Sequence, residues 1–303
     1  MQKKIILFFL SLILLFSFCF AQNDSLTKST SYKKTALISS TALVGTGSLF
    51  YLNQVWYKNY NTGKFHFFND NAEWLQMDKV GHIYTTYQIS RLMINGLKQS
   101  GFSHKKQLFI GGSVGLLYMT AIECMDGFSN GWGFSVGDQI ANFAGTSLAI
   151  AQHAFWKEQR IQLKFSYAKS GLAKYNPNLL GNNFYTQILK DYNAQTIWLS
   201  INPCSFFNKK TKLPAWLNIS FGYGAYGMIG AQKNNLIVLN ENGNLLEFER
   251  ERQYYFSFDV DLTKIKTKSK HLKTIFNLLN IIKIPGPTLE FNKHKTRFYF
   301  IYY

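Results

Sequence analysis

The sequence predicts an α+β protein, in which a bundle of three or four helices precedes an antiparallel sheet that carries one amphipathic helix. In the first half, apolar residues recur at helical spacing over long segments with few charges. From Arg160 onward they alternate at a period of two between clusters of turn residues. Helical spacing returns once, over 264–282, where lysines precede an apolar stretch.

The N-terminus has the composition of a signal peptide. Two lysines precede an apolar run, Ile5–Phe20, which is short for a membrane span, and the small residue Ala21 ends it. We expect cleavage after Ala21, so that the mature chain begins at Gln22. Lipidation at Cys19 and an uncleaved anchor helix are the alternatives. The protein is therefore expected to be exported to the periplasm or outer membrane, with the inner membrane as the alternative.

Four segments are expected to form helices. Thr35–Trp56 is 22 residues long without a charge, enough to cross a bilayer, but its Ser, Thr and Gly content also suits a buried core helix. The others are Asp78–Leu97, Gln107–Cys124 and Phe134–Phe155, the last opened by Ser135 as a possible N-cap. Whether the first and third of the four span a membrane stays open.

Candidate strands follow between turn signals. They are Ile161–Tyr167, Thr196–Asn202, Trp216–Tyr223, Tyr254–Leu262, Thr288–Phe291 and Arg297–Tyr303. The alternation in 256–262 fits a half-buried antiparallel strand. The closing aromatic segment, 297–303, resembles the last strand of outer-membrane barrels. Because both of its faces are apolar, a plain strand buried on both sides is the alternative.

Charge is concentrated in the second half. The net charge is +17; residues 22–158 hold 11 Lys/Arg against 8 Asp/Glu, and residues 159–303 hold 20 against 8. No nucleic-acid module is recognisable, so an anionic membrane surface is the expected partner, unless the lysines merely keep an aromatic sheet soluble. A helix over Lys264–Ile282 would either lie on that membrane or cover the sheet, and its contact residues would be Lys264, Lys266, Lys268, Lys270 and Lys273. Cys124 and Cys204 are expected to be free.

Polar residues inside the apolar helices form the candidate site. They are Asp78, His82, Glu123, Asp126, Asp138 and Asn142. A spacing of four puts Asp78 and His82 on one helix face, and Asp138 and Asn142 on another. A buried carboxylate is costly unless it is paired or coordinated, so these groups are expected to face one another.

Three kinds of chemistry fit this set. Four carboxylates and one imidazole could bind a divalent metal, through Asp78, His82, Glu123, Asp126 and Asp138, or form an acid–base pair. In the structural alternative the network only fixes helix register: Asp78 caps its helix, Lys79 is solvated and Asp138 bonds backbone amides. The sequence has no phosphate loop, no Cys-x-x-Cys and no nucleophile elbow.

Three blocks carry a resemblance to a known family. Asp78–His82, Glu123–Asp126 and Ser135–Gly145 resemble the signature blocks of the YfiM-like family, whose members are predicted periplasmic or outer-membrane lipoproteins of unknown function. The first block also resembles the Asp-Lys-x-x-His of VanZ-like membrane proteins. The resemblance covers about residues 75–150. The chain departs from the pattern at Asn142, where the family often has Asp, and in lacking a good lipobox.

These observations give one expected organisation and three candidate functions. Residues 1–21 form the signal peptide, 22–158 the helical domain and 159–303 the basic, aromatic sheet domain. The expected function is a non-catalytic envelope protein, periplasmic or outer-membrane-associated, with a buried Asp/His/Glu site. The alternatives are a metal- or acid/base-dependent enzyme acting on an envelope lipid or glycan, and a small outer-membrane β-barrel. Whether the chain is an enzyme stays open, and a divalent metal is the one cofactor these residues suggest.

Overall fold

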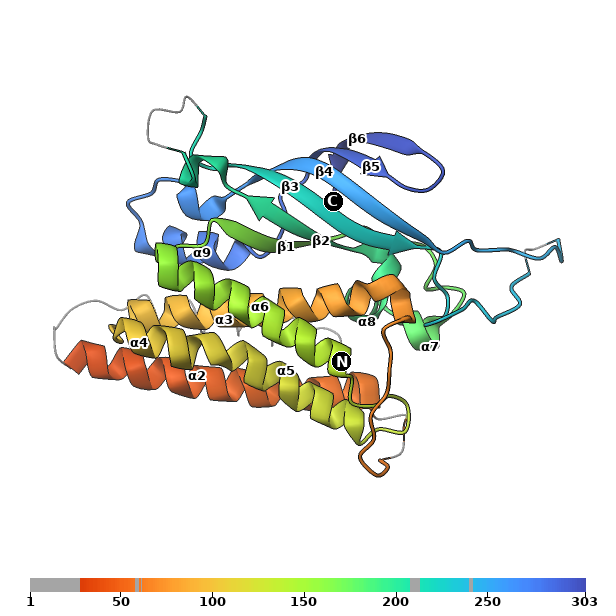
Figure 1. Cartoon of the computed structure of the whole chain (residues 1–303), viewed down its shortest axis with the longest axis horizontal. Coiled ribbons are helices and arrows are strands. Elements are labelled where there is room, and N and C mark those ends of the chain that lie inside the picture. The colour runs from red at the N-terminus through yellow and green to blue at the C-terminus, as the bar shows by residue number, and fades with distance from the viewer. Residues whose placement is uncertain (1–27, 58–59, 61, 208–212, 240–241) are drawn as a thin grey trace.

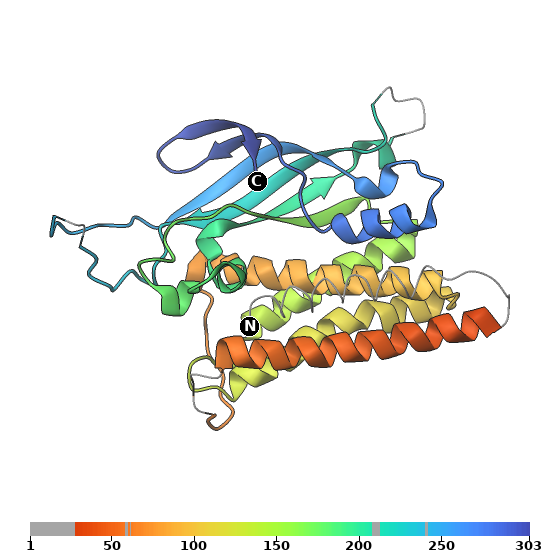
Figure 2. The same ribbon diagram turned by 180° about the vertical axis from the view of Figure 1, so that it is seen from behind.

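The fold is α+β, as predicted. The computed structural model describes residues 28–57, 60, 62–207, 213–239 and 242–303, so the expected signal peptide and its cleavage site lie outside the described residues. A helical bundle forms one layer and an antiparallel sheet lies on it (Figures 1 and 2). The chain passes from the last helix of the bundle directly into the first strand.

All four expected helices are present, with shifted ends. Ser135 caps the last of them as predicted, since its Oγ accepts a hydrogen bond from the Asp138 amide at 3.1 Å. The helices are α2 (Lys28–Leu52) with the π-helical turn η1 (Asn53–Tyr57), α3 (Met77–Gln99), α4 (His104–Lys106) with η3 (Gln107–Gly111) and α5 (Gly112–Gly127), and α6 (Val136–Trp156). The short 3-10 turn η2 (Glu73–Gln76) leads into α3.

Glycines let α5 and α6 approach α3 closely. A Cβ added at Gly145 of α6 would lie 2.1 Å from the carbonyl oxygen of Ile83, and one at Gly115 of α5 would lie 2.4 Å from that of Thr86. Both distances are far below van der Waals contact, so only glycine fits at these crossings. The close approach brings polar groups of α5 and α6 against the first turns of α3.

Two described segments, Tyr32–Tyr57 and His104–Gly127, are long and apolar enough to cross a membrane by length and composition. The first buries only 6% of its most apolar window inside the protein, and the second 28%. Thus α2 is not the buried core helix that was the alternative for Thr35–Trp56. It lies on the far side of the bundle from the sheet (Figure 1).

The sheet has six strands in the order of the sequence, each antiparallel to its neighbours. They are β1 (Ile161–Tyr167), β2 (Gln195–Ile201), β3 (Leu217–Tyr226), β4 (Glu251–Val260), β5 (Gly286–Phe291) and β6 (Thr296–Tyr302). All six predicted strands are therefore present. Among the described strands, β1 and β6 lie at the two ends of this order. The edge of β1 bonds to the segment 281–283 that precedes β5.

Three expectations for the second half need correction. The basic helix is shorter than predicted: α9 spans Lys270–Leu279, because Ser269 caps it, and Lys266 and Lys268 lie in the connection before it. The last strand is not buried on both faces, since Phe298 and Phe300 are 60% and 80% exposed. Two short helices, α7 (Pro177–Leu180) and α8 (Phe184–Lys190), were not predicted.

The helical and sheet halves share their hydrophobic cores. Leu163 of β1 packs in one cluster with Tyr87, Ile94 and Ala149 of the bundle. Met77, at the start of α3, packs with Ala225 and Met228, where β3 ends. The start of α3, which carries Asp78 and His82, is thus held against the sheet.

Candidate functional site

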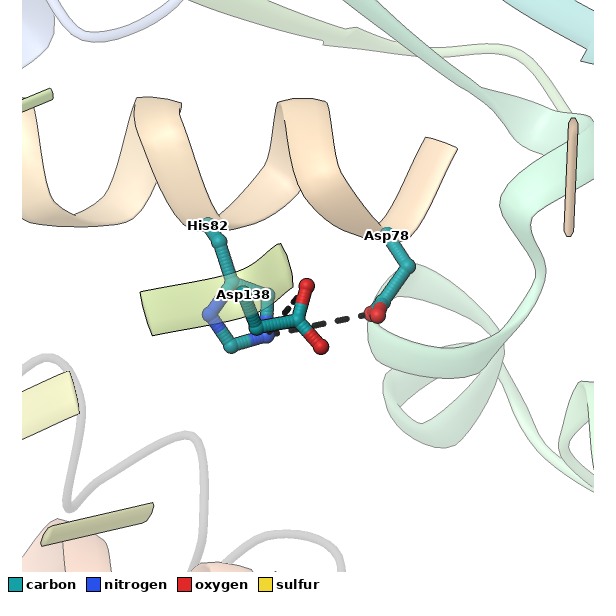
Figure 3. Close-up of side chains that lie close together, drawn as sticks. All are labelled: Asp78, His82 and Asp138. Carbon is teal, nitrogen blue, oxygen red and sulfur yellow. Dashed lines mark ion pairs between the residues drawn. The ribbon is translucent and has the colours of Figure 1, made fainter. Parts of the chain in front are cut away.

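The imidazole of His82 lies at the centre of a cluster of carboxylates from three helices. Its Nε2 is 3.6 Å from Oε1 of Glu123 on α5, 3.9 Å from Oδ1 of Asp78 on α3, and 4.0 Å from Oδ1 of Asp138 on α6. Figure 3 shows Asp78 and His82 projecting from the same side of α3, with Asp138 beside the ring. The i, i+4 spacing on α3 places the first two together, and the close crossings of α5 and α6 bring the others.

Asn142 fixes the orientation of the ring. His82 Nδ1 lies 3.0 Å from Oδ1 of the fully buried Asn142, one turn along α6 from Asp138. With the amide oxygen toward the ring, Nδ1 carries the proton of the neutral imidazole. Nε2 then directs its lone pair toward the three carboxylates, which is the state a base or a metal ligand requires.

Ser135 links Glu123 to the start of α6. Its backbone amide donates to Oε2 of Glu123 at 3.0 Å, and its hydroxyl donates to Oδ1 of Asp70 at 2.6 Å. Glu123 is 1% exposed, so this bond and the facing His82 largely define its surroundings. The N-cap of α6 therefore positions two carboxylates besides its own helix.

Lys79 is the cation of the cluster. Its Nζ lies 2.6 Å from Asp70, 2.8 Å from Asp138 and 3.6 Å from Asp78, and its side chain is 12% exposed. The expectation that Lys79 is solvated is therefore wrong. Asp78 does not cap α3 either; Gln76 holds that position, and Oδ1 of Asp78 accepts a hydrogen bond from the Tyr192 hydroxyl at 2.6 Å.

Asp126 stands beside the cluster rather than in it. Its Oδ1 accepts a hydrogen bond from the Tyr57 hydroxyl at 2.6 Å. The structure thus brings Asp78, His82, Glu123, Asp138 and Asn142 together as expected from the sequence, and gives Asp126 a different partner.

Burial and crowding perturb the carboxyl groups. Burial, together with the charge of Asp78, raises the pKa of Asp138 to about 9. Burial likewise raises the pKa of Glu123 to about 7, against the pull of His82, and that of Asp126 to about 7. For Asp70 burial acts upward too, but hydrogen bonds from Asp138, Lys79 and Ser135 outweigh it and lower the pKa.

The upward shifts of Glu123, Asp126 and Asp138 share a cause: negative groups outnumber positive ones, and burial makes each unpaired negative charge expensive. Lys79 pairs with Asp70, Asp78 and Asp138, so three carboxyl groups share its one positive charge. Protons therefore stay on part of the set at neutral pH. A divalent cation could take over that role.

The donor geometry suits such an ion. A tetrahedral ion bound at about 2.1 Å holds its ligand atoms roughly 3.4 Å apart. The distances from His82 Nε2 to the three carboxylate oxygens, 3.6–4.0 Å, are slightly longer than this. The donor atoms of Asp78, His82 and Asp138 all lie within 4.8 Å of one another. One imidazole with carboxylate oxygens suits Zn²⁺ or Mn²⁺ rather than a soft, thiolate-seeking metal.

Several residues of the site were missed by sequence reasoning. Lys79 sits inside the Asp78–His82 block, and its neighbours could have indicated an ion pair. Asp70 lies in a polar loop with no periodicity to place it. Tyr192 is 114 positions from Asp78 and comes from the sheet half, so only the tertiary fold shows it.

The predicted membrane lysines lie elsewhere, around α9. Lys264, Lys266, Lys270 and Lys273 line a groove of about 720 Å³ together with Lys33 of α2. Lys264 also forms an ion pair of 2.8 Å with Glu158. Lys268 does not line this groove. Cys124 is exposed, whereas the thiol of the half-buried Cys204 donates to the carbonyl oxygens of Leu213 and Pro214.

Comparison with known proteins finds one similarity, and it covers the helical site. Residues 66–154 match the model of a family described as predicted periplasmic lipoprotein (DUF2279), and this stretch contains every residue of the predicted polar site. The chain matches no curated protein and no solved structure. Over these residues the chain is thus similar to an uncharacterised family of periplasmic lipoproteins, which supports an exported protein of the cell envelope.

Proposed function

We propose that the protein is an envelope protein whose helical half binds one divalent metal ion. The ligands are His82 Nε2 and the carboxylates of Asp78, Glu123 and Asp138, with Asn142 orienting the ring. One observation carries the proposal: a single imidazole nitrogen faces carboxylates of three helices in a buried site where negative groups outnumber cations.

A purely structural network explains this geometry less well. The gaps of 3.6–4.0 Å between Nε2 and the three oxygens exceed hydrogen-bond length. Groups that only fixed helix register would close those gaps, because a buried polar group gains little at that distance. A cation between the His82 imidazole and the three carboxylates could bind all four groups at coordination distance.

Acid–base catalysis on an envelope lipid or glycan is the second candidate. Glu123, with its pKa raised to about 7 by burial, faces His82, and such a pair is suited to moving a proton near neutral pH. A bound metal would add Lewis-acid chemistry at the same place. The likeness to YfiM-like and VanZ-like proteins remains a prediction. A location at the outer membrane instead of the inner membrane is likewise a prediction.

We further propose that an anionic membrane surface is a partner of this protein. The lysine groove beside α9 offers several ammonium groups to anionic lipid headgroups. Charge reversal at Lys266 and Lys270 is expected to weaken binding to anionic vesicles, and added salt should act in the same direction. Equal binding of variant and wild type at low salt would leave α9 as a cover for the sheet.

Thermal unfolding with added metal tests the site. The purified protein, stripped with a chelator, is expected to gain unfolding temperature with Zn²⁺ or Mn²⁺, because an ion that binds only the folded state stabilises it by about 2.7 kcal/mol at a hundredfold excess over Kd. His82→Asn and Asp138→Asn should abolish this gain.

Asp259→Asn is the matched control. Asp259 is also a buried carboxylate, but it pairs with Lys164 and accepts a hydrogen bond from Ser200 within the sheet. That variant should lose stability and keep the full response to metal. No response in the wild type, or an equal response in all variants, would contradict the proposed metal site.

A further inference from the structure

The sheet has the reverse polarity of a sheet in a water-soluble protein. An antiparallel sheet normally buries its apolar side and exposes its polar side. Here the polar side of β3, β4 and β5 is the buried one: Asn218, Ser257 and Glu290 are each at most 1% exposed. The opposite side of the same strands carries exposed aromatic residues.

The inner side is enclosed, and charged side chains on it are paired within the protein. Lys164 of β1 forms an ion pair of 2.7 Å with Asp259 of β4, and neither side chain has any exposure. Tyr302 of β6 reaches across to Thr196 of β2 at 3.1 Å and stacks near Tyr255 at 4.8 Å between ring centroids. The last hairpin therefore curls over the polar side and keeps water from it.

The outer side forms a continuous apolar surface. One lateral row of directly paired residues crosses four strands: Phe221 pairs with Phe256, Phe256 with Leu289, and Leu289 with Phe298. We call the surface around this row the aromatic face; its residues are Phe221, Tyr254, Phe256, Phe258, Leu289, Phe291, Phe298 and Phe300. Six of the eight are between 42% and 80% exposed.

We propose that the aromatic face lies against the acyl chains of a phospholipid bilayer. No member of the face carries a charge or an amide, and Tyr254 alone carries a hydroxyl. An exposed apolar patch of this kind marks an interaction site. The proposal is independent of the metal site, and it concerns the sheet alone, since α2 lies on the far side of the bundle (Figures 1 and 2).

Two features favour lipid over a protein partner. A protein interface is on average little more apolar than the rest of the surface and carries about ten hydrogen bonds, whereas the paired row offers only hydrocarbon. The charges also lie at the ends of the strands. The lysine groove follows the end of β4, and Lys293 and Lys295 lie in the turn between β5 and β6. An aromatic band between cationic ends fits acyl chains flanked by anionic headgroups.

Vesicle flotation of the mature protein tests the proposal. The double variant Phe298→Gln with Phe300→Gln changes two exposed side chains, so the fold should persist. Binding to vesicles of phosphatidylethanolamine and phosphatidylglycerol at high salt is expected to fall about tenfold or more, since each Phe contributes substantially when it leaves water. High salt removes the contribution of the lysine groove.

The matched control is Phe67→Gln with Phe155→Gln. These aromatic residues are 68% and 82% exposed but belong to the helical half, outside the two segments that are apolar enough to cross a membrane. This control should bind like the wild type. Equal loss in both double variants would overturn the assignment to the sheet. A wild type that ignores vesicles and forms a dimer that the Phe298 and Phe300 changes dissociate would overturn lipid in favour of self-association. Unchanged flotation of the sheet variant would refute the proposal outright.

Discussion

At the scale of single residues, the site is defined by which group carries which proton. Asn142 holds one nitrogen of His82, so the other faces the carboxylates. Sequence spacing predicted this much, because residues four apart share a helix face. It could not predict that Lys79 turns inward, since a lysine beside an apolar run is more often solvated; Asp70 draws it in from a loop with no periodic signal.

Metal affinity should rise with pH. Carboxyl groups must lose their protons to bind a cation, and burial raises the pKa of Glu123 to about 7 and that of Asp138 to about 9. The metal-free protein should behave oppositely. A raised pKa means that the folded state holds more protons, so its stability falls as pH climbs between about 4 and 9. Chemical denaturation across this range, with and without metal, measures both trends, and a metal-free stability that rises throughout would contradict the protonated site.

Asn142→Leu should weaken metal binding by about 10- to 100-fold, the usual cost of removing a partner that orients a ligand. Asn142→Asp keeps an oxygen acceptor for Nδ1 and should retain most of the affinity. Isothermal titration calorimetry measures the metal affinity of each variant. If both variants bind equally well, Asn142 does not orient His82.

At the scale of elements, long periodic helices and alternating strands were predictable, and short or irregular segments were not. The predicted basic helix began at Lys264, whereas α9 begins at Lys270, after the N-cap Ser269. The lysines at every second position before Ser269 lie outside the helix. Asn176 and Asn183 cap the short helices α7 and α8, but asparagine is equally typical of turns, so neither helix was predictable. What positions the site is the crossing of α5 and α6 with α3, through glycines whose partners the sequence does not reveal.

Gly145→Ala should therefore destabilise the protein by about 1–3 kcal/mol, the cost of forcing an extra methyl group into a packed contact. Its Cβ would meet the Ile83 carbonyl oxygen and the Thr86 hydroxyl. Gly45→Ala on α2 is the matched change, with nothing within 4 Å of the added Cβ. That variant should gain up to about 1 kcal/mol from helix propensity. Urea unfolding of both decides it, and a neutral Gly145 variant would mean that the crossing is looser than described.

At the scale of the whole molecule, the two halves that composition separates are joined by packing. Residues 159–303 are basic and aromatic, yet Leu163 of β1 belongs to the same cluster as Tyr87 and Ile94 of α3. Arg91 of α3, fully buried, donates to Asn277 of α9 at 2.7 Å, and Tyr192 reaches Asp78. Domain boundaries drawn from composition at residue 158 remain a prediction, because composition records the change of element type and not the contacts across it.

We expect the two halves to unfold together in one calorimetric transition. Leu163→Ala should lower the stability of that transition by about 2–5 kcal/mol, the usual cost of a cavity left by a buried leucine. Leu117→Ala on α5 is the control, because that side chain is 68% exposed and its loss removes little packing. Since Leu163 contacts the bundle from the sheet, the signals of both layers should shift to the same new midpoint. Two separate transitions, with only the sheet affected by the Leu163 change, would show that the halves are independent folding units and that their shared core contributes little to cooperativity.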